Sequence, residues 1–468
     1  MRLRSIIDLR LSALRVTLIG RKEDARRRKI LYLGEGNFVE PRARSRRSKC
    51  TIQYDKMKIW LPKNQKELKG YLKDPLYKNS FFIMLTSISN AGFGFIFWML
   101  AAKLYPKEDV GIATALISSM ALLVLLSRFG LDQSIIRFFP ERDKGSVFST
   151  SAIITTFFAV LFGIIFIAGI DLWSPQLDIV RKYALLYLVF LAANSIVSLT
   201  GVSFIGIRRA EYYFFQSLLV GSRVIFLFPL VFLGALGIFS SVGISFIIAS
   251  IFSAFFLFRF GIKPSGIDRK FLNDSFHFSA GNYIAGLLMT APNQILPIMV
   301  LNILGAEETA HYYIAYAIAS LLFMIPGAFS TSLFVEGSHG EALKKNTLKA
   351  LFAIASLLAP AVIILYLFGG LLLGIIGKSY VEGFDSLRIF ALSSFFVAIC
   401  QLYFSIKKVQ KDIKGLIFLS VLIFVLLIGL SYVFMLEFGI LGVGYAWMVG
   451  YGLSSLVVGV IVWREGWV

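Results

Sequence analysis

Residues 212–235 read YYFFQSLLVGSRVIFLFPLVFLGA, a hydrophobic stretch of membrane-spanning length with one arginine near its middle. A helix rises about 1.5 Å per residue, so about 20 apolar residues cross a hydrocarbon core of about 30 Å. Counted from Tyr213, Arg223 lies about 15 Å into such a span. An arginine at that depth costs at least about 2.5–3.5 kcal/mol to insert and normally faces a bundle interior or a watery cavity. Arg223 is therefore the first candidate for a functional residue.

The composition extends this pattern to the whole chain. Of 468 residues, 57% are hydrophobic and 16% are charged, as expected for repeated apolar runs of about 20 residues. The sequence therefore predicts an all-α polytopic membrane protein. Its twelve predicted spans are 79–104, 110–127, 147–170, 183–205, 213–234, 238–258, 276–303, 310–335, 350–376, 387–405, 415–435 and 439–463.

The loop charges orient these spans, because cytoplasmic loops are rich in Lys and Arg. Loops after even-numbered spans, with the C-terminus, hold 18 basic residues, whereas loops after odd-numbered spans hold six. This predicts a multi-pass protein of the cell (plasma) membrane with both termini in the cytoplasm. All 19 acidic residues after residue 78 lie in loops or at span ends, so no mid-membrane carboxylate is available as an ion relay. The predicted external loops are too short for a catalytic domain, so we do not expect an enzyme.

Residues 1–78 differ from the rest, with 22 Lys and Arg against 8 Asp and Glu. Such charge runs with little apolar content predict a disordered, basic cytoplasmic arm. An equally weighted alternative is that Met57 is the true start and residues 1–56 are mistranslated upstream sequence. Beyond the arm we expect a lobe over 79–260, a cytoplasmic linker over 261–275 and a second lobe over 276–468.

A faint repeat supports the division into two lobes. Residues 106–110 and 306–310 precede the second and eighth predicted spans with an offset of 200. Six spans per half would give the halves the same orientation, with a substrate between them. Chance similarity among apolar sequences is the alternative explanation.

Metal and cofactor chemistry is not predicted. Cys50 and Cys400 are the only cysteines, and His277, His311 and His339 are far apart in sequence without an HExxH spacing. We therefore expect no metal site, no cofactor, no catalytic residue and no nucleic-acid partner.

Arg223 is the strongest candidate for binding a substrate. Its planar guanidinium can hold a phosphate or carboxylate through two parallel hydrogen bonds. Gln216 lies seven residues earlier and is predicted to share its helix face. The alternative is a structural arginine that caps backbone carbonyls of a broken helix.

Two further polar stripes could face a cavity. Asn90 lies in the first span between Thr86 and Gly94, at four-residue spacing. The seventh span carries amides beside two prolines, whose missing backbone bonds a cavity or a neighbour must replace. These residues are Asn282, Asn293, Gln294, Pro292 and Pro297. Both stripes could equally be helix-packing seams.

Arginines and tyrosines also gather at the predicted span ends. Four arginines at cytoplasmic ends are expected to meet lipid headgroups, with recruitment of an anionic lipid substrate as the alternative role. They are Arg128, Arg137, Arg208 and Arg209. Tyr312, Tyr313 and Tyr316 at the outer end of the eighth span are predicted to be interfacial aromatics.

The segment that runs from Val110-Gly111 through LSRFGLDQSIIRFFP at 126–140, with GIRRA at 206–210, resembles a known family. It is similar to the polysaccharide exporters and Wzx-type oligosaccharide flippases of the MATE-like (MOP) superfamily, over residues 57–468. The resemblance implies twelve helices in two six-helix lobes around a central cavity that opens alternately to each side. It also implies a substrate glycan on an isoprenoid phosphate or pyrophosphate lipid. Family members have cationic cavities, and here Arg223 is the one deep cation.

The function expected from the residues and the resemblance is that of a flippase for a lipid-linked oligosaccharide in surface polysaccharide or glycoprotein assembly. Membrane lipids and glycan assembly enzymes are the other expected partners. One alternative is a multidrug or organic-ion exporter of the same superfamily, although a buried Arg without buried carboxylates disfavours cationic substrates. The other is a membrane scaffold that transports nothing.

Overall fold

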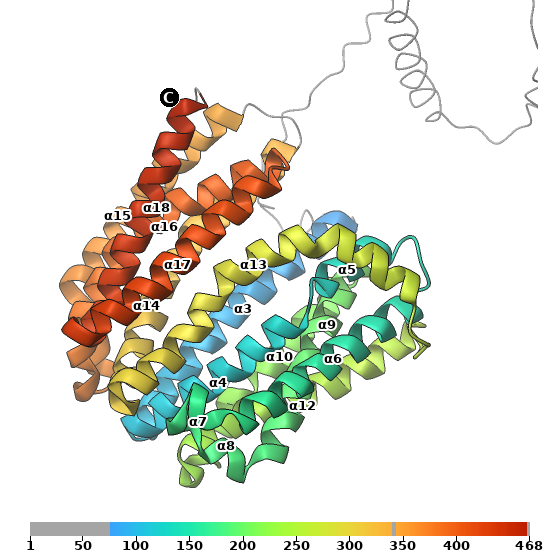
Figure 1. Cartoon of the computed structure of the whole chain (residues 1–468), viewed down its shortest axis with the longest axis horizontal. Coiled ribbons are helices and arrows are strands. Elements are labelled where there is room, and N and C mark those ends of the chain that lie inside the picture. The colour runs from blue at the N-terminus through green and yellow to red at the C-terminus, as the bar shows by residue number, and fades with distance from the viewer. Residues whose placement is uncertain (1–74, 339–342, 466–468) are drawn as a thin grey trace, which may run out of the picture. The chain divides into compact units, whose positions relative to one another are not determined.

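A computed structural model of the chain describes residues 75–338 and 343–465. Most of the basic arm predicted over 1–78, including Met57, lies outside the described residues. Within the described ranges every regular element is a helix (Figure 1). The elements of the first half are α3 Pro75–Leu104, α4 Lys107–Ser127, α5 Leu131–Phe138, α6 Lys144–Ala168, α7 Ile170–Trp173, η1 Pro175–Leu177, α8 Ile179–Lys182, α9 Ala184–Gly206, α10 Ala210–Gly221, α11 Arg223–Phe226, η2 Val231–Leu233 and α12 Ala235–Arg259. Those of the second half are α13 Arg269–Leu304, α14 Ala306–Ser338, α15 Leu343–Ile376, η3 Lys378–Gly383, α16 Phe384–Val409, α17 Ile413–Phe438 and α18 Ile440–Arg464.

The predicted all-α membrane fold is confirmed. In the described part of the chain, 11 helices are long and apolar enough to cross a membrane, namely α3, α4, α6, α9 and α12 to α18. Several of these helices begin where the sequence supplies a cap. Asp143, Asp268 and Asp412 each precede a helix, and their carboxylates accept hydrogen bonds from backbone N–H groups of its first turn.

The fifth predicted span is not one continuous helix over 213–234. Instead α10 ends at Gly221, Arg223 begins the one-turn helix α11, and the short η2 follows. The Ser222 hydroxyl donates a hydrogen bond to the Leu219 carbonyl at 2.6 Å, and Pro229 has no N–H with which to continue a helix. The expectation of a single helix is thereby corrected, and Arg223 lies at the break.

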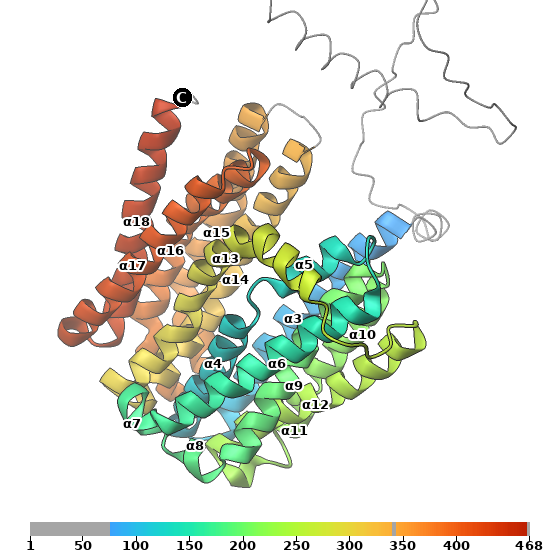
Figure 2. The same ribbon diagram turned by 45° about the vertical axis from the view of Figure 1, so that its right-hand side comes forward.

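The helices pack in two groups (Figures 1 and 2). In one group α9 packs on α6 and α12, and α10 packs on α3; in the other α16 packs on α14, α15 and α18. Two helix pairs carry most of the contact between the groups: α4 with α14, and α4 with α13, which also packs on α17. The expected two-lobed arrangement is confirmed, whereas the lobe boundary at 261–275 stays a prediction.

The N-terminal ends of α4 and α14 meet at close range. A methyl group on Gly111 would lie 1.8 Å from the carbonyl oxygen of Ala306, so only a glycine permits this approach. Beside it, Lys107 forms an ion pair with Glu307 across the two lobes. These helix ends belong to the two segments that the 200-residue offset aligns.

Candidate functional site

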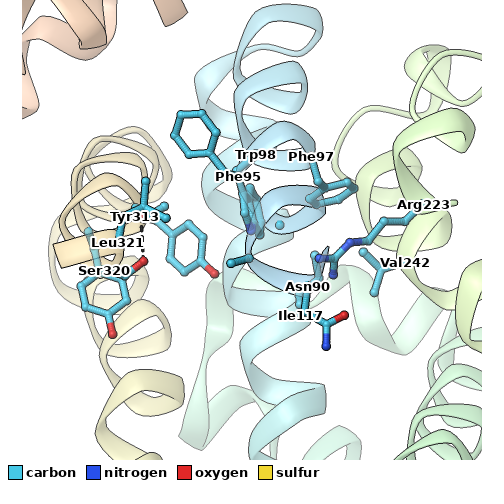
Figure 3. Close-up of a pocket in the computed structure, with 14 residues that line it drawn as sticks. Asn90, Phe95, Phe97, Trp98, Ile117, Arg223, Val242, Tyr313, Ser320 and Leu321 are labelled. Carbon is cyan, nitrogen blue, oxygen red and sulfur yellow. Dashed lines mark hydrogen bonds between the residues drawn. The ribbon is translucent and has the colours of Figure 1, made fainter. Parts of the chain in front are cut away.

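A cavity of about 280 Å³ lies where α3, the break before α11 and α14 meet (Figure 3). Arg223 reaches it from the break and Asn90 from α3. The other lining residues are Ala91, Gly94, Phe95, Phe97, Trp98, Ile117, Val242, Tyr313, Tyr316, Ala317, Ser320 and Leu321. Among the residues that line it, Arg223 is the one with a charged side chain. The structure thus brings together Arg223 and Asn90, two of the residues singled out in the sequence.

The guanidinium of Arg223 is placed by aromatic and small neighbours. Its central carbon lies 5.0 Å from the centre of the Phe97 ring, and Figure 3 shows it between Phe97 and Asn90. Gly94 lies next to it, since a methyl group there would be in ordinary van der Waals contact with Nη2 at 3.6 Å. The buried Nε has no hydrogen-bond partner, and no described carboxylate or carbonyl accepts a bond from this side chain. The cavity therefore holds a cation without a counter-ion in the described part of the chain.

This arrangement does not fit the alternative of a structural cap. An arginine that capped a broken helix would donate hydrogen bonds to free carbonyls, and none runs from Arg223 to a described residue. Leaving a buried charged donor unmatched is costly unless a ligand or water supplies the acceptor. The site can thus accept an anion, for which a guanidinium offers two parallel N–H groups.

Tyrosines of α14 form one wall of the cavity. Tyr313 lies 4.6 Å from Trp98, measured between ring centres, and Tyr316 donates a hydrogen bond to Asn293 Oδ1 at 3.0 Å. Tyr312 is 0% exposed. The prediction that these tyrosines are interfacial is wrong, because they pack inside the protein against α3, α13 and α16.

Gln216 does not reach the cavity. Its amide nitrogen donates hydrogen bonds to the Val197 carbonyl at 2.9 Å and to Thr200 Oγ1 at 2.8 Å, which fastens α10 to α9. Gln216 is thus held against α9, and the expectation that it lines a substrate site with Arg223 is not met in this structure.

The amides of α13 are divided between two environments. Asn293 lies behind Tyr316 and fixes its hydroxyl, so it supports the cavity wall without lining it. Asn282 and Gln294 are half-buried and lie outside the cavity. Pro292 and Pro297, singled out in the seventh predicted span, both lie inside α13. The sequence analysis did not predict that aromatic side chains line the cavity. The available signal was the cluster of aromatic residues at the start of the eighth predicted span.

Two of the four predicted cytoplasmic arginines are engaged within their own segment. Arg128 lies 3.9 Å from Asp132, and Arg137 pairs with Glu141 one helical turn away. The exposed Arg137–Glu141 pair is of a kind that contributes about 0–1 kcal/mol and exchanges readily with other ions, whereas Arg128 and Asp132 are partly buried. A role for either arginine in contact with lipid headgroups stays a prediction.

The other two arginines follow α9. Arg208 is exposed, has a left-handed backbone with φ of 59°, and has no ion-pair partner among the described residues. Arg209 pairs with Glu211 at 3.3 Å, and Lys78 pairs with the same carboxylate at 2.8 Å. Burial raises the pKa of Glu211, but hydrogen bonds from Lys78, the backbone and Arg209 outweigh it and lower the pKa below its usual value. Arg208 is thus the freest of the four to meet an anionic headgroup.

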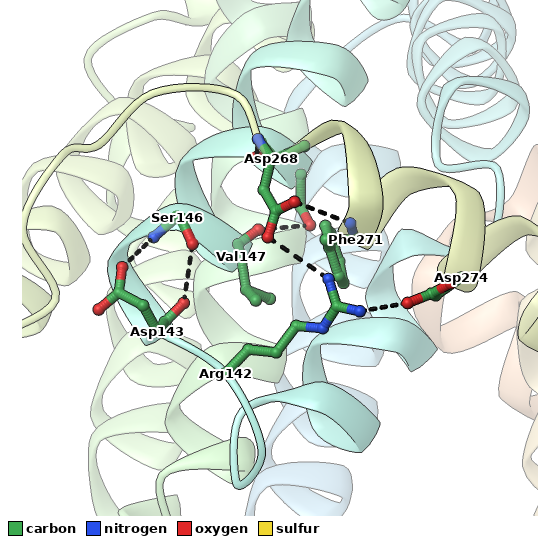
Figure 4. Close-up of polar contacts among 9 residues, drawn as sticks. Arg142, Asp143, Ser146, Val147, Asp268, Phe271 and Asp274 are labelled. Carbon is green, nitrogen blue, oxygen red and sulfur yellow. Dashed lines mark hydrogen bonds and ion pairs between the residues drawn. The ribbon is translucent and has the colours of Figure 1, made fainter.

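A second polar cluster joins the loop before α6 to the start of α13 (Figure 4). Arg142 lies 3.4 Å from Asp268 and also pairs with Asp274, with its guanidinium carbon 5.3 Å from the Phe138 ring centre. Asp268 also caps α13 by accepting a hydrogen bond from Phe271 N at 2.9 Å. The helix cap can be predicted from the sequence, because Asp268 directly precedes the helix. The ion pairs join residues more than 120 positions apart, so no local sequence pattern predicts them.

We expect Arg142→Ala to loosen the linker over residues 261–275, because two partly buried carboxylates lose their shared cation. The expected loss is about 1 kcal/mol of unfolding free energy, as for partly exposed ion pairs. Limited proteolysis should cut the linker faster than in wild type. Arg137→Ala is the control, since the ion pair of Arg137 with Glu141 lies within one segment and does not connect it to the linker. Equal cleavage in the two variants would contradict the tethering role.

Comparisons with known proteins agree with this fold. Residues 76–335 match the family model described as "Polysaccharide biosynthesis protein". A Shigella flexneri protein named, provisionally, as an O-antigen transporter is 29% identical over 226 residues, which is 45% of this chain and 52% of the relative. The chain therefore spans about half the length of this curated relative.

Solved structures share the fold at low identity. An inward-facing multidrug resistance transporter of the MATE family, in the MOP superfamily, superposes with a TM-score of 0.67 at 16% identity, covering 82% of this chain and 98% of that chain. The lipid II flippase MurJ in an inward closed conformation gives 0.66 at 14% identity, with 82% and 87% covered. These structures show a MATE-like fold. The resemblance to the polysaccharide exporter family is confirmed by the family match and the curated relative.

Proposed function

The chain belongs to the polysaccharide biosynthesis protein family, and from this premise we propose that it is a flippase that moves a lipid-linked oligosaccharide from the inner to the outer leaflet. Its curated relative is named for O-antigen transport, and one of its fold neighbours is named for flipping lipid II. The observation that carries the proposal is the unpaired guanidinium of Arg223 in a cavity beside the α4–α14 contact between the lobes.

The chemistry of the cavity matches the headgroup of such a lipid. Arg223 offers two parallel N–H groups to a phosphate or pyrophosphate, a geometry that strengthens charge-assisted bonds. The Asn90 amide can exchange hydrogen bonds with sugar hydroxyls, while Trp98 and Tyr313 add aromatic rings with polar N–H and O–H groups to the lining. A cavity lined by one cation and mostly apolar side chains favours a ligand that has a compact anionic group and a larger uncharged part.

The size of the cavity supports alternating access. Its volume of about 280 Å³ lies below the range of about 300–1,000 Å³ typical of sites for drug-sized ligands. A glycan of several sugars can pass only if the lobes move apart. The contact between α4 and α14, which includes the ion pair of Lys107 with Glu307, would then be broken and remade in each cycle.

The electrical potential can drive this transport. No carboxylate is among the residues that line the cavity, so a proton or sodium relay of the usual kind is not built into it. Moving a lipid with about two negative charges outward across a potential negative inside gains roughly 2.3 kcal/mol per charge per 100 mV. This account assumes the orientation predicted from loop charges, in the plasma membrane with cytoplasmic termini.

The proposal is tested with protein reconstituted in vesicles that carry a fluorescent, short-chain pyrophosphate-linked glycan under an imposed potassium diffusion potential. We expect movement of the glycan lipid to accelerate when the potential draws the anion across and to slow when its sign is reversed. The matched control is the same glycan on an uncharged lipid, which should move no faster than in empty vesicles. The proposal would be contradicted if the rate of transport did not depend on the potential but transport stopped when a cation gradient was removed.

A multidrug exporter is the rival with a structural observation behind it, since a fold neighbour is a multidrug transporter. A lipophilic organic cation would meet the like charge of Arg223 in the cavity, which costs binding energy in a low-dielectric site. Uptake of such a cation by the same vesicles, without movement of the glycan lipid, would favour this rival. A scaffold would move neither compound; a partnership with glycan assembly enzymes stays a prediction.

A further inference from the structure

Away from the cavity, one histidine is buried without a hydrogen-bond partner among the described residues. His311 in α14 is 1% exposed, and neither ring nitrogen has a hydrogen-bond partner among the described residues. The ring lies edge-on to Tyr380 of η3, with 5.9 Å between ring centres, so packing fixes its position. A buried polar group left without a partner costs about 1–3 kcal/mol. A ligand on the ring nitrogen would remove that cost.

Three carboxylates surround this ring. Nδ1 of His311 lies 3.7 Å from a Glu308 oxygen and 3.8 Å from a Glu382 oxygen. The ligand atoms of His311, Glu382 and Glu307 all lie within 4.8 Å of one another. The two measured distances are too long for hydrogen bonds. They fit a shared ion better, because two ligand atoms each about 2.1 Å from one tetrahedral metal lie about 3.4 Å apart.

We propose that Glu307, His311 and Glu382 form a binding site for a divalent first-row transition metal such as Zn²⁺. An imidazole nitrogen with carboxylate oxygens suits these ions, whereas Ca²⁺ and Mg²⁺ take mainly oxygen ligands. His311 supplies the rigid ligand from α14, and Glu382 supplies an exposed carboxylate from η3 that is free to rotate toward the ion. Glu308 adds a further carboxylate beside the ring, 3.7 Å from Nδ1 of His311.

The proposed site shares a residue with the contact between the lobes. Glu307 is the partner of Lys107, which begins α4 in the other lobe. A metal bound to the Glu307 carboxylate competes with the Lys107 ammonium and repels it. Metal binding would therefore weaken the lobe contact at this end of α4 and α14. This consequence for transport rests on the proposed alternating access, whereas the metal site does not depend on what is transported.

The site is tested by metal binding to the full-length protein in lipid nanodiscs, without a polyhistidine tag. Co²⁺ is titrated and its visible absorption bands are followed, and bound Co²⁺ is then displaced with Zn²⁺. We expect one bound ion per chain, no displacement by Mg²⁺ or Ca²⁺, and loss of affinity in His311→Gln. Since loss of even an outer-shell partner costs about 10–100-fold in affinity, the loss of this ligand should exceed about 10-fold.

Matched variants make the outcome specific. His277→Gln removes an exposed histidine elsewhere and should bind Co²⁺ like wild type. Glu382→Gln should weaken binding, whereas Asp385→Asn should not, although the two carboxylates are similarly exposed at 68% and 66%. Glu382→Gln also keeps the test valid if the buried His311 variant fails to fold. Lys107→Met should tighten binding several-fold, because it removes the competing cation.

Two results would overturn the proposal. One is a wild-type protein that binds no stoichiometric Co²⁺ or Zn²⁺, and the other is a His311→Gln variant, shown to be folded, that binds the metal as tightly as His277→Gln does. Binding is measured without any transport substrate. Failure of the metal site and failure of the flippase proposal are therefore distinguishable.

Discussion

Arg223→Ala is expected to insert and fold but to lose movement of the glycan lipid by at least about 10-fold. Each hydrogen bond to a charged group contributes about 1.5–3 kcal/mol, and alanine removes both parallel bonds to the phosphate together with the positive charge. The measurement is the initial rate of translocation in vesicles under an imposed potential, with the amount of inserted protein quantified. Folding should survive, because Arg223 donates no hydrogen bond to another described residue.

Two further variants distinguish the loss of charge or donor geometry at Arg223 from a general loss of protein stability. Arg223→Lys keeps the charge but not the planar pair of donors, so it should retain part of the activity. Arg388→Ala is the matched control, because the Arg388 guanidinium also lies over an aromatic ring, 4.0 Å from the centre of Phe384, but outside the cavity. If Arg223→Ala moved the lipid at the wild-type rate, the cavity would not be the anion site.

Gly111→Ala is expected to weaken the packing of α4 against α14, although it adds only one methyl group. That methyl would lie 1.8 Å from the Ala306 carbonyl oxygen, and a backbone atom cannot rotate away as a flexible side chain can. Overpacking of this kind costs about 1–3 kcal/mol, and the helices must separate at the end where Lys107 meets Glu307. Thermal unfolding in nanodiscs should show a lower transition temperature than wild type.

The control for this effect is Gly429→Ala in α17. No atom lies within 4 Å of a methyl group at that position, and alanine favours a helix over glycine by about 1 kcal/mol. It should therefore be neutral or slightly stabilising. A Gly111→Ala protein as stable as wild type would show that α4 and α14 do not meet as closely as described.

The candidate site was predictable only in part. Arg223 stood out because a charge in the middle of an apolar run is rare and needs no neighbour to be noticed. Asn90 was singled out on a different ground, as part of a polar stripe at four-residue spacing in the first predicted span. Gln216 was misplaced because it bonds to Val197 and Thr200 of α9, and no sequence spacing indicates that α10 packs on α9 through this residue. The tyrosine wall was misread, since a position near the end of a span does not reveal which helices cover it.

The site around His311 shows the same limit more sharply. Glu382 lies 71 positions after His311 and belongs to a different element, so no motif spacing joins them. Only the packing of η3 against α14 brings their side chains together. The sequence on its own indicated no metal site, and the structure supports proposing one.

By itself, the sequence determined that this protein is a bundle of apolar helices, which stretches can span a membrane, and that one of them carries an arginine. Those properties follow from hydrophobicity summed over neighbouring residues. The tertiary structure decided where the fifth stretch breaks, which side chains line the cavity and which residues meet between the lobes. The physical reason is that lipid is as apolar as a helix interface, so no hydrophobic periodicity marks the face that each helix turns inward.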